Sequence, residues 1–168
     1  LVDTTVNNPG KVAVSEISSN NYAGGAAAFK AVQRAGVSGG KVMGIGTKPG
    51  ISTTDARDKG FQDAVAKNSN FEFLGLEYSQ NEPSIAAQIT TAAIAANPDL
   101  KAIFASNLFS AQGAATGIKQ AGKEGEIVVI GFDAGPAQID ALKDGTVQAL
   151  IAQKPYNIGT QGVTQALR

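Results

Sequence analysis

Short apolar runs alternate along this chain with longer segments of helical periodicity. The runs expected as strands are residues 41–47, 71–78, 101–106, 126–132 and 147–153. The helices expected around them are residues 22–35, 52–67, 85–96, 112–121, 136–143 and one that begins near Pro155. Strands that alternate with helices at intervals of roughly 25 to 30 residues indicate βαβ crossovers. The pattern predicts a doubly wound α/β domain, with a mostly parallel sheet of about five strands and helices on both faces.

Residues 1–21 lack this alternation of strands and helices. Residues 12–17 alternate like a short strand, and residues 7–10 have the composition of a turn. We therefore expect a connector in residues 1–21, followed by the domain proper in residues 22–168.

The fourth predicted strand ends abruptly in a carboxylate. Its apolar, β-branched residues show no polar alternation, which is typical of a strand buried on both faces. Asp133 follows directly, with Gly135 and then Pro136 placed to open a helix. Open parallel sheets bind ligands at the carboxyl ends of their strands, so Asp133 is the first candidate for a functional residue.

Like the fourth strand, each apolar run ends in groups able to form hydrogen bonds. Over all five runs these groups are Thr47, Gln80, Asn81, Ser106, Asn107, Asp133 and Gln153. In a parallel sheet they converge on one edge, and amides and carboxylates without a nucleophile and base indicate a pocket for a neutral polar ligand. Capping of the following helices explains Asn107 and Asp133 equally well at this stage.

Composition narrows the chemistry further. The 14 basic and 14 acidic residues cancel and form no basic stripe, which argues against nucleic-acid binding. The absence of Cys and His excludes thiolate or imidazole metal sites, Cys nucleophiles and His-based triads, so we expect no enzyme and no cofactor. The glycines of residues 44–50 miss the spacing of a dinucleotide-binding fingerprint, and Pro49 removes a backbone donor, which favours an ordinary loop.

Three further side chains attract attention. Arg57 lies near the start of a predicted helix, where a cation opposes the helix dipole, and this placement hints at an external partner. A surface cation paired with a neighbouring acid is the open alternative. Phe109 and Phe132 are expected to pack in the core rather than form a stacking platform.

Several segments, in order and spacing, resemble one known family. They are NNYAGG (20–25), DARDKGF (55–61), NPD (97–99) leading to ASN (105–107), VIGFD (129–133), and LKDGT (142–146) leading to IAQ (151–153). The chain is similar to the sugar-binding periplasmic proteins of ABC transporters, of the ribose-binding-protein type with the periplasmic binding protein-like I fold. That resemblance implies two α/β lobes joined by a hinge. It makes residues 1–21 the end of a first-lobe strand, crossover and hinge, and residues 22–168 the second lobe, truncated at its C-terminal end, with the first lobe missing.

The resemblance also implies roles for individual residues. Arg57, Asn107, Asp133 and Gln153 would hydrogen-bond sugar hydroxyls, with Phe132 beside them. Asp3 matches a first-lobe carboxylate that also binds sugar.

Two departures argue against ribose itself. Thr4 stands where the ribose type has arginine, and Asn81 stands where it has an aromatic residue. A hexose, another pentose or a polyol remains open.

The function implied is that of a solute-binding component that closes two lobes on a small-molecule sugar and delivers it to a membrane permease. Such a protein is periplasmic or extracellular, and membrane-associated if it is a lipoprotein. The alternative is the effector-binding core of a lac-repressor-type regulator. Residues 144–155 are more similar to the transporter branch.

Overall fold

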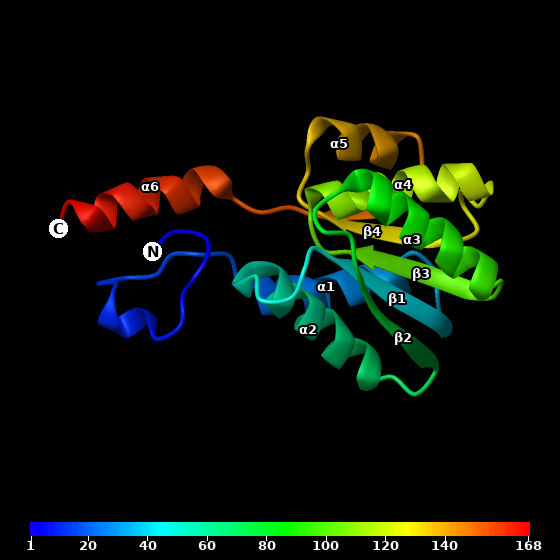
Figure 1. Ribbon diagram of the computed structural model, residues 1–168, viewed down its shortest axis with the longest axis horizontal. Helices are drawn as coiled ribbons and strands as arrows, with labels where there is room; N and C mark the ends of the chain where they lie inside the picture. The colour runs from blue at the N-terminus through cyan, green and yellow to red at the C-terminus, as the bar shows by residue number, and fades with distance from the viewer.

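A five-stranded parallel sheet forms the centre of the computed structural model, which describes residues 1–168 (Figure 1). Its strands are β1 (Gly40–Gly46), β2 (Phe71–Tyr78), β3 (Leu100–Ala105), β4 (Val128–Phe132) and β5 (Ala149–Ile151). They lie in the order β2-β1-β3-β4-β5, and every neighbouring pair is parallel. The predicted doubly wound α/β class is confirmed.

Six α-helices and one short 3-10 helix accompany the sheet. They are η1 (Pro9–Lys11), α1 (Asn21–Arg34), α2 (Ser52–Ala66), α3 (Pro83–Ala96), α4 (Leu108–Ala121), α5 (Pro136–Lys143) and α6 (Pro155–Ala166). Helices α1 and α2 cover one face of the sheet, and α3, α4 and α5 cover the other (Figure 1).

The core consists of two apolar clusters, one on each face of the sheet. Successive residues of a strand alternate between them: Val42 and Phe104 face α1 and α2, whereas Met43 and Ile103 face α3 and α4. Because both faces are buried, every strand position gains from an apolar side chain. This is why the strands read in the sequence as continuous apolar runs.

Glycines bring α1 and α2 into backbone contact. A β-carbon on Gly25 would overlap the carbonyl oxygen of Arg57, and one on Gly60 would overlap the carbonyl oxygen of Tyr22. Only glycine permits an approach this close. The position of Arg57 is therefore fixed by helix packing as well as by its own side-chain contacts.

The strand expected over residues 12–17 is not present. That segment begins at Val12, the residue that follows η1, and forms only a single bridge, between Val2 and Ile17; Val14 is 100% exposed. A segment of alternating polarity forms a strand only where it can pair with a neighbouring strand or pack its apolar side chains against a core. The segment has neither, so its backbone stays irregular.

Three boundaries also differ from the prediction. Helix α4 begins at Leu108, not residue 112, because Asn107 caps it by accepting a hydrogen bond from the Ser110 backbone N–H at 3.0 Å. Strand β5 is shorter than residues 147–153, since only Ala149–Ile151 pair with β4. Helix α2 ends at Ala66 rather than at residue 67, since Lys67 is its C-cap; near its start, Asp55 accepts from the Gly50 backbone N–H at 2.9 Å.

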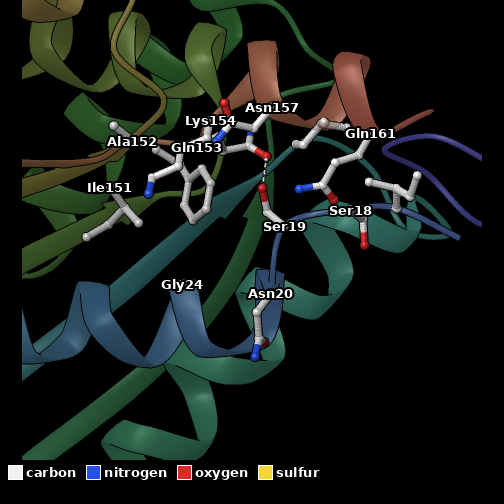
Figure 2. Close-up of a pocket in the computed structure, with 13 residues that line it drawn as sticks. Ser18, Ser19, Asn20, Gly24, Ile151, Ala152, Gln153, Lys154, Asn157 and Gln161 are labelled. Atoms are coloured by element: carbon white, nitrogen blue, oxygen red, sulfur yellow. Dashed lines mark hydrogen bonds between the residues drawn. The ribbon is translucent and has the colours of Figure 1, made fainter. Parts of the chain in front are cut away.

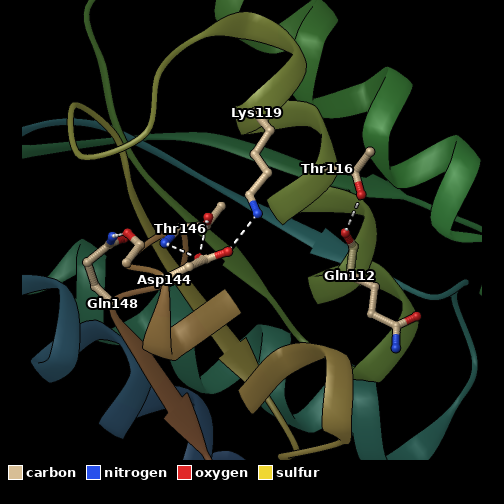
Figure 3. Close-up of polar contacts among 7 residues, drawn as sticks. Gln112, Thr116, Lys119, Asp144, Thr146 and Gln148 are labelled. Atoms are coloured by element: carbon tan, nitrogen blue, oxygen red, sulfur yellow. Dashed lines mark hydrogen bonds and ion pairs between the residues drawn. The ribbon is translucent and has the colours of Figure 1, made fainter. Parts of the chain in front are cut away.

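The connection from α5 to β5 is held by the carboxylate of Asp144 (Figure 3). Its Oδ1 atom accepts from the backbone N–H and hydroxyl of Thr146 at 2.9 and 2.6 Å, and its Oδ2 atom accepts from Lys119 Nζ on α4 at 2.7 Å. Lys119 and Thr146 lower the pKa of Asp144 to about 2. This clamp lies at the amino end of β5, opposite the polar edge predicted from the sequence.

The two ends of the chain extend away from the sheet in the same direction (Figure 1). Helix α6 buries no residue, and Tyr156 is 83% exposed. No helix in the structure is both long and apolar enough to cross a membrane.

Candidate functional site

The predicted polar groups lie at the carboxyl ends of the strands, next to the place where the sheet order reverses. Strand β1 lies between β2 and β3, so its two neighbours are reached by connections that run in opposite directions. Doubly wound sheets form their ligand crevice at such a switch point.

Arg57 projects from α2 into this edge and is only 4% exposed. Its Nε atom donates to Asn21 Oδ1 at 2.9 Å, and its NH1 atom donates to the carbonyl oxygen of Ser106 at 2.9 Å. The guanidinium carbon lies 3.8 Å from the centroid of the Phe132 ring, a cation–π arrangement. The alternative of a surface cation is wrong, because the side chain is buried and its polar partners come from α1 and β3.

Burial and nearby acids act in opposite directions on this guanidinium. Burial lowers the pKa of Arg57, and the negative charges of Asp133, Asp3 and Asp58 oppose that effect. Burial also raises the pKa of Asp58 to about 6, and its Oδ1 atom has no hydrogen-bond partner. Asp3 and Asp133 thus lie near enough to act electrostatically on Arg57.

Asp133 leaves β4 in the left-handed region, at φ 73°. Its backbone N–H donates to the carbonyl oxygen of Ile151 at 2.9 Å, and its Oδ1 atom accepts from Gln153 Nε2 at 2.6 Å. It does not cap α5, whose N-cap is Gly135. A left-handed non-glycine residue persists only where its surroundings hold it, and such residues cluster at functional sites.

Asn81 and Asn107 form a second pair, at the ends of β2 and β3. Asn107 Nδ2 donates to Asn81 Oδ1 at 2.6 Å, and Asn81 is left-handed at φ 66°. The capping alternative is therefore correct for Asn107, since its Oδ1 atom caps α4. Its Nδ2 group faces the polar edge at the same time.

Two neighbouring cavities occupy the space between this edge and the outlying segments. The larger, about 590 Å³, is lined by Asp3, Asp133, Gln153 and Leu108 among others. The second, about 370 Å³, includes Phe132 and Gln153 with residues of the chain before α1 and of α6 (Figure 2). Both volumes fall in the range of small-molecule sites.

The structure gathers most, but not all, of the predicted site residues. Asp3, Asp133, Gln153 and Phe132 line the two cavities, whereas Arg57 reaches the same region from beneath Phe132. Asn81 and Asn107 do not line either of them. Phe132 is buried in the core as predicted, but Phe109 is not, because it is 38% exposed at the start of α4.

The sequence prediction missed two polar residues just before and at the start of α1. Asn21 holds Arg57, and Ser19 Oγ donates to Gln153 Oε1 at 2.7 Å (Figure 2). Asn20 is the N-cap, accepting from the Ala23 backbone N–H at 3.0 Å. The sequence did offer one indication, since two asparagines stand side by side at residues 20 and 21 and a helix needs only one N-cap residue.

The side chains at this edge offer amide, carboxylate, guanidinium and hydroxyl groups beside an aromatic ring. The structure contains no cluster of three or more acidic residues that could hold a metal ion. Donors and acceptors of this kind suit hydrogen bonding to a polar molecule. The fold and site define a doubly wound α/β domain with a hydrogen-bonding crevice at its switch point.

Comparison with known proteins agrees with this class. A family model described as a periplasmic binding protein domain matches residues 1–168, and the chain belongs to that family. It is 35% identical over 153 residues to the ribose import binding protein of Salmonella typhimurium, covering 91% of this chain and 51% of the relative. It is 30% identical over 148 residues to the D-allose-binding periplasmic protein of Escherichia coli, covering 88% and 48%. The chain thus spans about half the length of these relatives.

Solved structures give the same result. A solute-binding protein of an ABC transporter from Agrobacterium vitis, bound to α-D-tagatopyranose, superposes with a TM-score of 0.92 at 39% identity, covering 99% of this chain and 58% of that one. A second from the same organism, with bound D-fucose, has a TM-score of 0.91 at 36% identity, covering 98% and 57%.

Proposed function

We propose that this chain is the second lobe of a solute-binding protein that holds a monosaccharide or related polyol between two lobes and delivers it to an ABC permease. The observation that carries the proposal is the cluster of Asp133, Gln153 and Arg57 with Phe132, at the carboxyl ends of β4 and β5. Similarity to ribose- and allose-binding transport proteins supports it over the effector-binding core of a lac-repressor-type regulator. Lobe closure on a ligand is the usual mechanism of such proteins, and no covalent step is needed.

In this proposal the polar groups contact different hydroxyls of one sugar. Asp133 uses one carboxylate oxygen for Gln153 and offers the other to a hydroxyl, and Arg57 donates its remaining N–H groups. Asn107 donates from the far side, beside Asn81. Charge-assisted bonds of this kind are about twice as strong as neutral ones, which favours Asp133 and Arg57 as the main determinants of affinity.

Asp3 supplies a carboxylate from the outlying segment. It lines the larger cavity together with Asp133 and Gln153, although it is far from them in the sequence. We assign residues 1–21 to the end of a first-lobe strand, the crossover and the hinge, and residues 22–168 to the second lobe. The protein would work in the periplasm or outside the cell, attached to the membrane if it is a lipoprotein.

The test is a sugar screen on the full-length, two-lobe protein. D-Tagatose, D-fucose, D-allose and D-ribose are added in a thermal-shift assay, because a ligand that binds only the folded state raises the melting temperature. Calorimetric titration then gives the affinity of each hit. Binding of one of these sugars at micromolar concentration supports the proposal. Absence of a shift with every monosaccharide and polyol, together with specific DNA binding, would establish the regulator instead.

A further inference from the structure

The Arg57 side chain is oriented by three contacts that all come from outside α2. Asn21 and Ser106 each accept one of its N–H bonds, and the ring of Phe132 lies against one face of the guanidinium. A guanidinium carries five N–H donors in a fixed plane, so two bonds and one stacking contact define where the remaining donors point. Those remaining donors are the ones that the proposed function assigns to the sugar.

Asn21 is the contact that binds the Nε edge of this plane. It is 7% exposed, and its Nδ2 group donates to the carbonyl oxygen of Ser19 at 3.1 Å. A carbonyl only accepts and Arg57 Nε only donates, so the two neighbours fix which way the Asn21 amide is turned. Helix capping does not account for Asn21, because Asn20 performs it.

The hydrogen bonds continue from Asn21 to the opposite side of the crevice. Ser19 Oγ donates to Gln153 Oε1 at 2.7 Å (Figure 2), and Gln153 Nε2 in turn donates to Asp133 Oδ1 at 2.6 Å. Residues 19–21 thus touch both the guanidinium on α2 and the amide that orients the carboxylate at the end of β4. These residues also connect the outlying N-terminal segment to α1.

We propose that Asn21 is a positioning residue for ligand binding, which orients Arg57 and, through Ser19, couples it to the Gln153–Asp133 pair. This inference rests on the proposed function, since it assigns Arg57 and Asp133 to the same ligand. The link from residue 19 to Gln153 adds a second consequence. A shift of residues 19–21 moves the Arg57 guanidinium and the Asp133 carboxylate together. Both groups are therefore oriented for the same ligand only when residues 19–21 hold the position seen here.

The test compares Asn21→Ala with the matched control Asn68→Ala in the full-length protein; Asn68 follows α2 at its far end and lines neither cavity of the site. Calorimetry measures the affinity for whichever of D-tagatose, D-fucose, D-allose or D-ribose binds the wild type, and thermal unfolding measures stability. Removing the acceptor from a buried guanidinium should weaken binding by at least about tenfold. Asn68→Ala, which loses only the hydrogen bond from Asn68 Nδ2 to the carbonyl oxygen of Ala64 at 2.8 Å, should lower the melting temperature and leave affinity within about twofold.

Two further variants separate positioning from general damage. Asn21→Asp restores an acceptor for Arg57 Nε and should regain part of the lost affinity. In an Arg57→Lys background, Asn21→Ala should have almost no further effect on affinity, because the fork that it orients is gone. Ser19→Ala should weaken binding less than Asn21→Ala, and the double variant should fall short of the sum of the two effects.

The outcomes distinguish the two claims. If the wild type binds one of the sugars and Asn21→Ala binds it equally well, or if Asn68→Ala weakens binding as much, the positioning role is wrong and the proposed function stands. If Asn21→Ala weakens binding by the same factor with and without Arg57→Lys, the residue does not act through Arg57. If the wild type binds none of the sugars, the proposed function and this inference both fail.

Discussion

Asp58 is a carboxylate buried beside Arg57 without a hydrogen-bond partner for its Oδ1 atom. Its pKa of about 6 lies above the ordinary value of an aspartate side chain, because burial disfavours the charged form. The folded protein therefore binds this proton more tightly than the unfolded chain does. Stability is lost as the pH rises from about 4 to about 6, and the loss persists above that window.

We predict that Asp58→Asn raises the free energy of unfolding at neutral pH by roughly 2 kcal/mol, since one pKa unit corresponds to about 1.4 kcal/mol. The gain should vanish below about pH 4, where Asp58 is protonated in both states. Urea unfolding at pH 4 and pH 7.5 measures it. The control is Asp63→Asn on the same helix: Lys59 and Tyr22 lower the pKa of Asp63, so that variant should lose stability at neutral pH. A gain that does not change with pH would show that the pKa of Asp58 is the same in the folded and the unfolded protein.

The Asp133 side chain is expected to determine the affinity for sugar. We predict that Asp133→Ala weakens sugar binding in the full-length protein by about tenfold to thousandfold, because hydrogen bonds to a charged group contribute roughly 1.5 to 3 kcal/mol each. Melting temperature should change little, since Asp133 does not cap α5. Asp140→Ala, an exposed carboxylate on α5, is the control for calorimetry. Equal affinities in the two variants would remove Asp133 from the site.

Two of the helices act as a unit, and this unit carries Arg57. The backbones of α1 and α2 touch at Gly25 and Gly60, and Asn21 at the start of α1 reaches Arg57 on α2. Any change that separates the helices therefore moves the guanidinium away from Asn21 and Phe132. Helix packing and ligand geometry depend on the same contact.

We predict that Gly25→Ala destabilises the protein by roughly 2 kcal/mol or more, because the added methyl group overlaps a backbone carbonyl and overpacking costs about 1 to 3 kcal/mol. Its sugar affinity should fall as well. Gly159→Ala is the control, since nothing lies within 4 Å of a β-carbon at that helical position. Alanine favours helix there, and stability should stay equal or rise slightly. Chemical unfolding measures both variants, and equal stabilities would mean that α1 and α2 can separate at little cost.

Much of the element order could be predicted because parallel strands buried on both faces leave apolar runs that the sequence displays directly. Asp133 and Gln153 could be predicted for the same reason, since each follows such a run. The strand at residues 12–17 was predicted wrongly, because alternation says nothing about whether a partner strand exists. The role of Asn21 could not be predicted from the asparagine pair alone, since it depends on Arg57, which lies 36 residues later in the chain and is brought to it by the packing of α1 on α2.

On the scale of the whole molecule, the crevice is open on one side. Its floor is the edge of the sheet, and residues of the outlying N-terminal segment and of α6 line the cavities next to it. Small-molecule sites usually bury about 70 to 90% of the ligand surface. A ligand bound to this chain alone would leave much of its surface in water.

We predict that the 168-residue chain alone folds but binds sugar at ~1 mM or more weakly, several kcal/mol short of the full-length protein. Calorimetric or NMR titration of both proteins with the same sugar measures the difference. The Asp133→Ala form of the short chain serves as the baseline for nonspecific binding. Matching micromolar affinities would show that one lobe holds the complete site.

The bond between Ser19 and Gln153 has a mechanical consequence. It joins the chain segment before α1 to the segment after β5. Two chain segments that are joined side by side resist twisting about their common direction, but they can still bend together. The two segments should therefore bend relative to the sheet about one axis. Loss of the hydrogen bond between Ser19 and Gln153 should allow them to twist as well.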